Sequence, residues 1–174
     1  MQAVRLPEKF ATYNAIQFSE GPIVPPNWFG SFELSCFGSK NFIGMHNLPR
    51  KAARYDAVIC CHVIESVGDP CKALQNLTRV LSAEGIIYLT YPSPVSRALT
   101  RDWGYPDPNQ HGHYRVFGRD FEHAYKSVIP GVTVIAVTGK DVVTGELDLH
   151  YLITKSALWK RRVMVAVSGA RLVQ

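Results

Sequence analysis

The stretch that decides the fold is Tyr55–Pro92, which reads YDAVICCHVIESVGDPCKALQNLTRVLSAEGIIYLTYP. Its run Asp56–Cys61 is almost entirely apolar, which is the pattern of a strand buried on both faces of a parallel sheet. The pair Asp69–Pro70 predicts the start of a helix, because Asp caps a helix and Pro fits its first turn. A second buried run, Ile86–Tyr91, follows the break at Gly85. Strand, helix and strand with short connections form a right-handed crossover unit, so the stretch predicts an α/β fold with two adjacent, parallel central strands.

Segments on both sides extend this unit. Ala15–Phe18 and Phe32–Phe37 are expected to be short strands, and a helix is expected from Gly118 onward. Pro92–Gln110 holds four prolines and few periodic apolar positions, so we expect a long loop there. An antiparallel pair of strands at the edge of the sheet is expected over Val132–Thr138 and Leu147–Thr154.

The composition fits one globular domain. The chain has 174 residues, of which 47% are hydrophobic and 19% charged, so it can bury a core and is not disordered as a whole. No apolar run is long enough to span a membrane, and the start MQAVRLPEKF lacks the apolar segment of a signal peptide. The four cysteines form no Cys-x-x-Cys pair, which favours a reducing compartment without disulfides or a zinc site. We therefore expect a cytoplasmic protein.

Positive charge gathers at the carboxyl end. From residue 149 onward there is no Asp or Glu but five basic side chains, which account for the formal net charge of +5. We expect an α/β domain over residues 1–154 and a basic tail over residues 155–174. The simpler interpretation is a solvated end, and the alternative is a contact with phosphates, acidic lipid or an acidic partner. Nucleic-acid binding has weak support, from a small patch made of Trp159, Lys160, Arg161 and Arg162.

Three motifs in the central stretch resemble those of the class I S-adenosylmethionine-dependent methyltransferases. Tyr55–Asp56 matches the pair that opens the fourth strand of that family, and His62–Glu65 matches the box that follows it. Arg79–Leu81 matches the Arg-Val-Leu that ends the next helix. Two departures are plain: Ser66 stands where the box often has a second His, and Ala83–Gly85 replaces a Pro-Gly-Gly turn.

The resemblance implies a fold and a cofactor. The expected fold is a Rossmann-like, doubly wound, mostly parallel sheet in a single domain that is truncated at its amino end, and the expected cofactor is S-adenosylmethionine. Ligands of such sheets bind beyond the carboxyl ends of the strands. The glycine-rich first motif is missing, and a Ser-Glu-Gly-Pro segment stands in its place. The expected cofactor-binding residues are Ser19, Glu20, Gly21, Glu33, Cys61 and His62.

Several of these assignments have alternatives. Glu33 is the candidate for binding ribose hydroxyls, yet it and Glu20 could be ordinary surface carboxylates. His62 could lie near the cofactor or only cap its strand. Glu65 could orient a ligand or cap the following turn.

His111 and His113 are the candidate catalytic residues. They follow a proline-rich loop that in the resembling family helps to cover the substrate, and imidazoles titrate near neutrality, as a general base requires. Alternatively they fix the loop through hydrogen bonds. A metal site is the least favoured interpretation, because a His-x-His pair supplies two ligands and no third is evident, although His62 or Asp107 could converge on them.

The leading hypothesis is a small methyltransferase that moves a methyl group from S-adenosylmethionine to an oxygen or nitrogen of a small or macromolecular acceptor. Its rival is a catalytically inactive, methyltransferase-like module for binding or assembly, which the missing glycine loop favours. The acceptor and the oligomeric state stay open, with a homodimer as one alternative.

Overall fold

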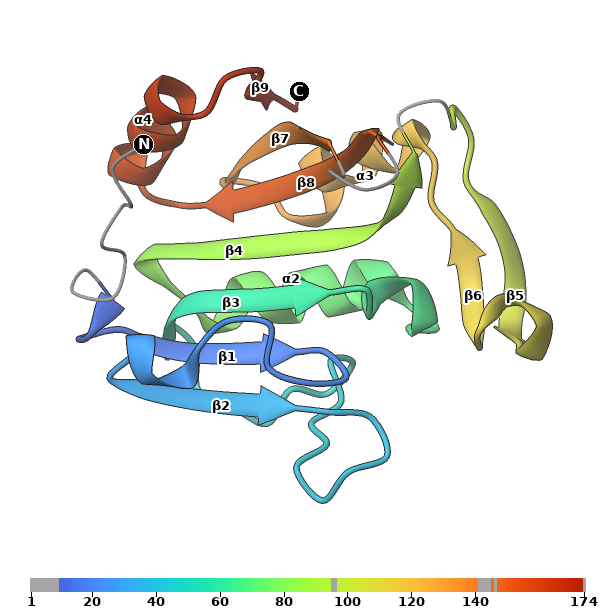
Figure 1. Ribbon diagram of the computed structural model, residues 1–174, viewed down its shortest axis with the longest axis horizontal. Coiled ribbons are helices and arrows are strands. Elements are labelled where there is room, and N and C mark those ends of the chain that lie inside the picture. Colours follow the sequence, from blue (N-terminus) through green and yellow to red (C-terminus); the bar gives the residue numbers. More distant parts are fainter. Residues whose placement is uncertain (1–9, 95–96, 141–144, 146, 174) are drawn as a thin grey trace.

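The computed structural model describes residues 10–94, 97–140, 145 and 147–173. A seven-stranded sheet in the order β2-β1-β3-β4-β8-β7-β9 forms its centre (Figure 1). Four neighbouring strands are parallel: β1 (Asn14–Phe18), β2 (Ser31–Ser35), β3 (Tyr55–Cys61) and β4 (Leu81–Pro94). The remaining pairings are antiparallel and involve β8 (Leu147–Thr154), β7 (Thr133–Lys140) and β9 (Arg171–Leu172). The expected adjacent parallel central strands and the expected antiparallel pair are confirmed.

Helices pack beside the sheet. The main ones are α2 (Pro70–Val80), α3 (Glu122–Val128) and α4 (Ala157–Ala166). Short 3-10 turns connect other elements: η1 (Pro26–Trp28), η2 (Ile64–Ser66), η3 (Pro108–Gln110) and η4 (Arg119–Phe121). In Figure 1, α2 and α3 lie behind the sheet, and α4 lies near the start of β4. No helix in the described part of the chain is long and apolar enough to cross a membrane.

The pairing of the strands aligns the core side chains in rows across the sheet. The five strands β1, β3, β4, β8 and β7 each contribute one side chain to each of two buried rows that pack against α2 and α3. The first row is Ile16, Val58, Ile87, Ile153 and Val134, and the second is Phe18, Cys60, Leu89, Tyr151 and Ala136. Complete burial of one such aliphatic side chain contributes about 1.5–3 kcal/mol, so the two rows contribute substantially to the stability of the fold.

The expected long loop over residues 92–110 is wrong. β4 extends to Pro94, and β5 (Arg101–Asp107) pairs antiparallel with β6 (His113–Val116) as a separate hairpin. Most of β5 is exposed, so its sequence shows no alternation of apolar and polar residues. Gly104 has φ +74° within a stretch where the register shifts, so the proline-rich segment makes an irregular strand.

Residues 155–173, expected as a basic tail, contain a helix and a short strand. Residues 157–166 form α4, whose first turn is capped by the Ser156 hydroxyl. Lys155 Nζ donates to the carbonyl oxygens of Thr78 and Leu81, at 2.8 and 3.3 Å. A cation at the carboxyl end of α2 is favourable because the last carbonyls of a helix carry partial negative charge. Together with β9, which pairs with β7, these contacts join residues 155–173 to the α/β domain.

The cap of α2 provides a test of the fold. Asp69 Oδ1 accepts a hydrogen bond from the Lys72 backbone N–H at 2.9 Å. We expect Asp69→Ala to lower the free energy of unfolding by about 1 kcal/mol, because a helix N–H loses its partner. Asp69→Ser retains a capping oxygen and should lose much less, as measured by urea unfolding. Equal losses in the two variants would contradict the capping role.

Candidate functional site

The parallel strands end at one edge of the sheet, and His62 follows the last residue of β3 there. Its backbone lies in the left-handed region, with φ +52°, and its N–H donates to the Thr90 carbonyl at 3.0 Å. Its side chain is 58% exposed. A left-handed backbone is uncommon outside glycine and is found at functional sites and turns. His62 is thus held by the backbone and presented to solvent.

Glu65, in η2, is completely buried, and neither carboxylate oxygen has a hydrogen-bond partner among the described residues. Burial raises the pKa of this carboxyl group to about 7. Two imidazoles flank its Oε1 atom: Nδ1 of His62 at 3.7 Å and Nε2 of His113 at 4.0 Å. Because an unpartnered buried charge is costly, this carboxyl group must keep a proton or acquire a partner.

The β5–β6 hairpin carries His113 to this position. In Figure 1 it stands beyond the carboxyl ends of β1 and β3. Arg115, which is nearly buried, pairs with Asp102 at 2.6 Å and donates to the carbonyl oxygens of Val67 and Gly68. These bonds fasten the hairpin to the segment that follows Glu65.

The two histidines predicted to be catalytic are neighbours. The ring centroids of His111 and His113 lie 6.0 Å apart, and His111 has a left-handed backbone with φ +56°. Burial lowers the pKa of His113, and the nearby His111 and His62 lower it further. The structure therefore brings His62, His113 and Glu65 together, with His111 beside them. No group of three or more His, Cys, Asp or Glu side chains within the described residues is arranged to hold a metal ion.

The loop after β1 lies at the same edge. The Ser19 hydroxyl accepts from the Gln17 amide and donates to the Gly21 carbonyl, so the turn is tied internally. Glu20 is exposed, and its carbonyl accepts from the Cys36 thiol at 3.2 Å, next to the end of β2. A Cβ atom added at Gly21 would meet nothing within 4 Å, so the space above this loop is open.

Glu33 lies elsewhere. It occupies the middle of β2, and its oxygens pair with Arg50 at 2.9 Å and Arg54 at 3.0 Å and accept from the Tyr55 hydroxyl at 2.8 Å. Burial alone would raise the pKa of Glu33, but hydrogen bonds from Tyr55 and the arginines bring it below its ordinary value. Tyr55 is the first residue of β3, so Glu33 faces the amino ends of the strands, apart from Glu20 and His62.

A polar pair on the other face of the sheet was not foreseen from the sequence. The Tyr88 hydroxyl lies 2.8 Å from Nδ1 of His150, and Cys61 points to the same face in the next row. Burial raises the pKa of Tyr88 to about 12. Tyr88 and His150 are 62 residues apart and meet only through the pairing of β4 with β8, which no local signal reveals.

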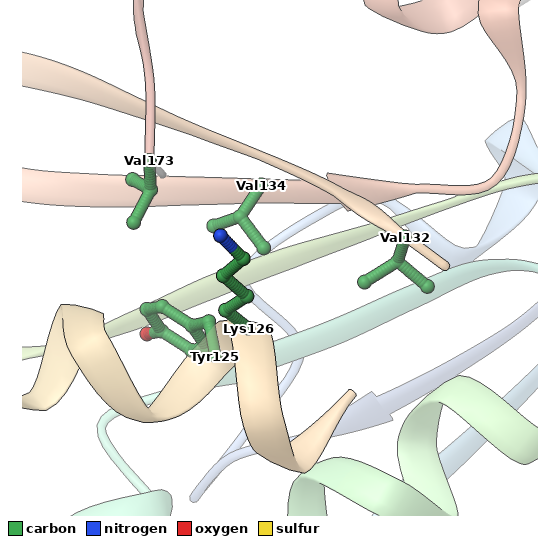
Figure 2. Close-up of a pocket in the computed structure, with 5 residues that line it drawn as sticks. All are labelled: Tyr125, Lys126, Val132, Val134 and Val173. Carbon is green, nitrogen blue, oxygen red and sulfur yellow. The ribbon is translucent and has the colours of Figure 1, made fainter. Parts of the chain in front are cut away.

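One hollow lies away from all these residues. It has a volume of about 310 Å³ and lies between α3, β7 and β9, with Val132, Val134 and Val173 among its lining (Figure 2). Lys126 extends from α3 toward the valines. None of the predicted site residues lines this hollow, so it is separate from the candidate site at the carboxyl edge of the sheet.

The buried carboxyl group predicts a pH dependence of stability. The pKa of Glu65 is about 7 in the folded protein and 4.5 in the ordinary reference, so the folded state binds more protons between these values. Stability should therefore fall as pH rises from about 4.5 to about 7, by about 3 kcal/mol from this group. Glu65→Gln removes the titrating group, so its free energy of unfolding should lack this decrease. The stability of the variant relative to the wild type should therefore increase as the pH rises. Urea unfolding at several pH values measures the difference, and parallel curves would contradict it.

Comparison with known proteins identifies a family that matches this chain. A family model described as a methyltransferase domain matches residues 11–127. No curated protein matches the chain at a significant level.

Many solved structures share the fold. The trans-methyltransferase CalH in complex with SAH is 10% identical, with a TM-score of 0.54, and the match covers 85% of this chain and 52% of CalH. A Burkholderia thailandensis 1,6-didemethyltoxoflavin-N1-methyltransferase is 13% identical, with a TM-score of 0.55 and coverage of 82% and 71%. The Haloferax volcanii complex of the Trm112 methyltransferase activator with a methyltransferase is 12% identical, with a TM-score of 0.56 and coverage of 87% and 85%.

Together these comparisons identify the fold and the family of the chain. The chain spans about half the length of CalH. The likeness to solved structures shows a Rossmann-like fold, and the family model matches well over half of the 174 residues. The chain therefore belongs to the methyltransferase domain family.

Proposed function

We propose that this protein transfers a methyl group from S-adenosylmethionine to an oxygen or nitrogen atom of an acceptor. The observation that carries the proposal is the exposed His62 beside the buried Glu65, at the carboxyl edge of a methyltransferase-family sheet. Ligands of open α/β sheets bind at this edge. The family membership and a titratable side chain at the binding edge support the same function.

The residues at the carboxyl edge of the sheet are of types suited to binding the cofactor. The loop Ser19–Gly21 offers backbone groups and open space at the end of β1, and the exposed Glu20 carboxylate is suited to ribose hydroxyls. Phe37, two residues beyond β2, is 86% exposed and offers an aromatic face to a base. When bound, the cofactor supplies a methyl group already activated by its sulfonium, so the protein needs chiefly to align the acceptor and accept its proton.

The acceptor is proposed only by class. One structure with the same fold is an N1-methyltransferase with 1,6-didemethyltoxoflavin bound, which supports a small molecule with a nitrogen nucleophile as one alternative. His62, His111 and His113 are the candidate proton acceptors, because each carries an imidazole near the edge where the acceptor would lie.

An inactive binding module remains the second candidate function. The specific observation that favours it is the loop after β1, which lacks the glycine-rich sequence that lets a backbone approach the cofactor closely. The two candidates differ in whether the edge binds the cofactor at all.

Titration calorimetry with S-adenosylmethionine and with its demethylated product distinguishes them. We expect both to bind the wild type, and Glu20→Gln to weaken binding about tenfold, the loss for one hydrogen bond to a charged group. Glu33→Gln is the matched control, because Glu33 already pairs with two arginines, and it should keep the wild-type affinity.

The opposite pattern would reassign the ribose contact to Glu33. A thermal shift gives a second readout, since a ligand that binds only the folded state raises its stability. If millimolar cofactor gives no binding heat and no thermal shift, the inactive module is the better account.

A further inference from the structure

The Glu65 carboxylate is a buried titratable group beside the candidate proton acceptor His62, and the proposed function gives it no role. It is completely buried, has no hydrogen-bond partner within the part of the chain that the structure describes, and lies near two imidazoles, His62 after β3 and His113 of β6. A purely structural glutamate in this position would be a poor choice, because an apolar residue of similar size avoids the cost of desolvation. The geometry therefore indicates a role through one of the imidazoles.

His62 is the imidazole that can connect Glu65 to a ligand. Its Nδ1 atom is the one that lies 3.7 Å from Oε1 of Glu65, which leaves Nε2 as the other ring nitrogen. Its side chain is 58% exposed, whereas that of His113 is 20% exposed. The distance is about 0.5 Å beyond a hydrogen bond, and catalytic hydrogen bonds are often long before a substrate binds.

We propose that Glu65 is a positioning residue that holds His62 as its Nδ1–H tautomer, so that Nε2 of His62 is the atom that accepts the proton of the methyl acceptor. The inference rests on the proposed function for the identity of that acceptor. His113 flanks the same carboxylate oxygen from the hairpin, at 4.0 Å.

The proton balance follows directly. The O–H or N–H bond of a neutral acceptor breaks, its proton goes to Nε2 of His62, and the electron pair left on the acceptor forms the bond to the methyl carbon. The methyl carbon's former bonding pair stays on the cofactor sulfur, which becomes neutral. The imidazolium keeps the positive charge beside the Glu65 carboxylate, and its exposed side returns the proton to water. No oxidant, reductant or metal ion takes part.

Other titratable groups surround Glu65 without replacing His62. The Cys60 and Cys61 thiols interact electrostatically with Glu65, and burial raises the pKa of both, so they stay protonated near neutrality. Arg115 is paired with Asp102. The titratable or charged groups on the elements packed against η2 are Cys71, Lys72 and Arg79 of α2 with Asp69 at its cap, Glu84, Tyr88 and Tyr91 of β4, and His113, Tyr114 and Arg115 of β6. Cys60 and Cys61 at the end of β3 and His62 directly after it precede η2 in the chain.

The tautomer of His62 can be measured without cofactor or acceptor. Nitrogen-15 NMR of the full chain, labelled at histidine and kept with a chelator at about pH 8.5, reports which ring nitrogen carries the proton. This pH lies above the pKa of about 7 for Glu65, so the carboxylate is ionised. We expect His62 to be mainly the Nδ1–H tautomer and the exposed His123 of α3 to be mainly Nε2–H, as an internal control.

Variants at residue 65 test the cause. Glu65→Leu removes the acceptor oxygen, so the ratio of Nδ1–H to Nε2–H in His62 should fall about tenfold, equivalent to about 1.4 kcal/mol. Glu65→Gln keeps an acceptor oxygen and should retain more of the Nδ1–H tautomer than the leucine variant.

The proposal is overturned if His62 of the wild type shows the same tautomer ratio as His123, and this outcome does not depend on whether any variant folds. An unchanged ratio in Glu65→Leu would overturn it as well. Calorimetric binding of S-adenosylmethionine tests the proposed function separately, so failure of one can be told from failure of the other.

Discussion

Burial of one face of the sheet against α2 and α3 is the constraint on which the rest of the structure depends. On β3, Val58 and Cys60 belong to that face. A slip of the register by one residue would turn all of them toward the opposite face, so the pairing of β1, β3 and β4 is fixed. This pairing determines where β3 ends, and hence that His62 leaves the sheet at the same edge as the loop after β1. The chemistry at the edge is therefore positioned by apolar packing some distance from it.

The sequence predicts the elements that are buried and misses those that are not. β3 and α2 were predictable because burial on both faces gives a continuous apolar run and a capped helix gives a regular stripe. The hairpin of β5 and β6 was not, because exposed strands carry no periodic signal. α4 gives little signal in the sequence because its residues are mostly exposed and several are basic, and Val163 is its one buried side chain. What decides these elements is contacts such as those of Lys155 with the end of α2, which are not local in sequence.

The sequence predicts where the candidate site lies better than it predicts which residues form it. The position of His62 after a buried strand was enough to indicate the binding edge. The burial of Glu65 depends on the hairpin that covers it, which residues 101–116 form far along the chain. The involvement of Glu33 with Arg50 and Arg54 likewise arises from a loop that folds back over β2. Glutamate side chains are rarely fully buried, so the sequence favours an exposed position for both Glu65 and Glu33, and only the assembled fold shows that Glu65 is enclosed and Glu33 paired.

The left-handed backbone of His62 has a consequence for how this position changes over evolutionary time. Most side chains pay about 1–2 kcal/mol in that conformation, whereas glycine and asparagine adopt it readily. Where an imidazole is not needed, substitution of His62 by glycine or asparagine should increase stability, whereas alanine or valine would keep the cost of the left-handed backbone. If the proposed function holds, histidine at this position in a related chain is expected where the proton acceptor is kept, and glycine or asparagine where only the turn is kept.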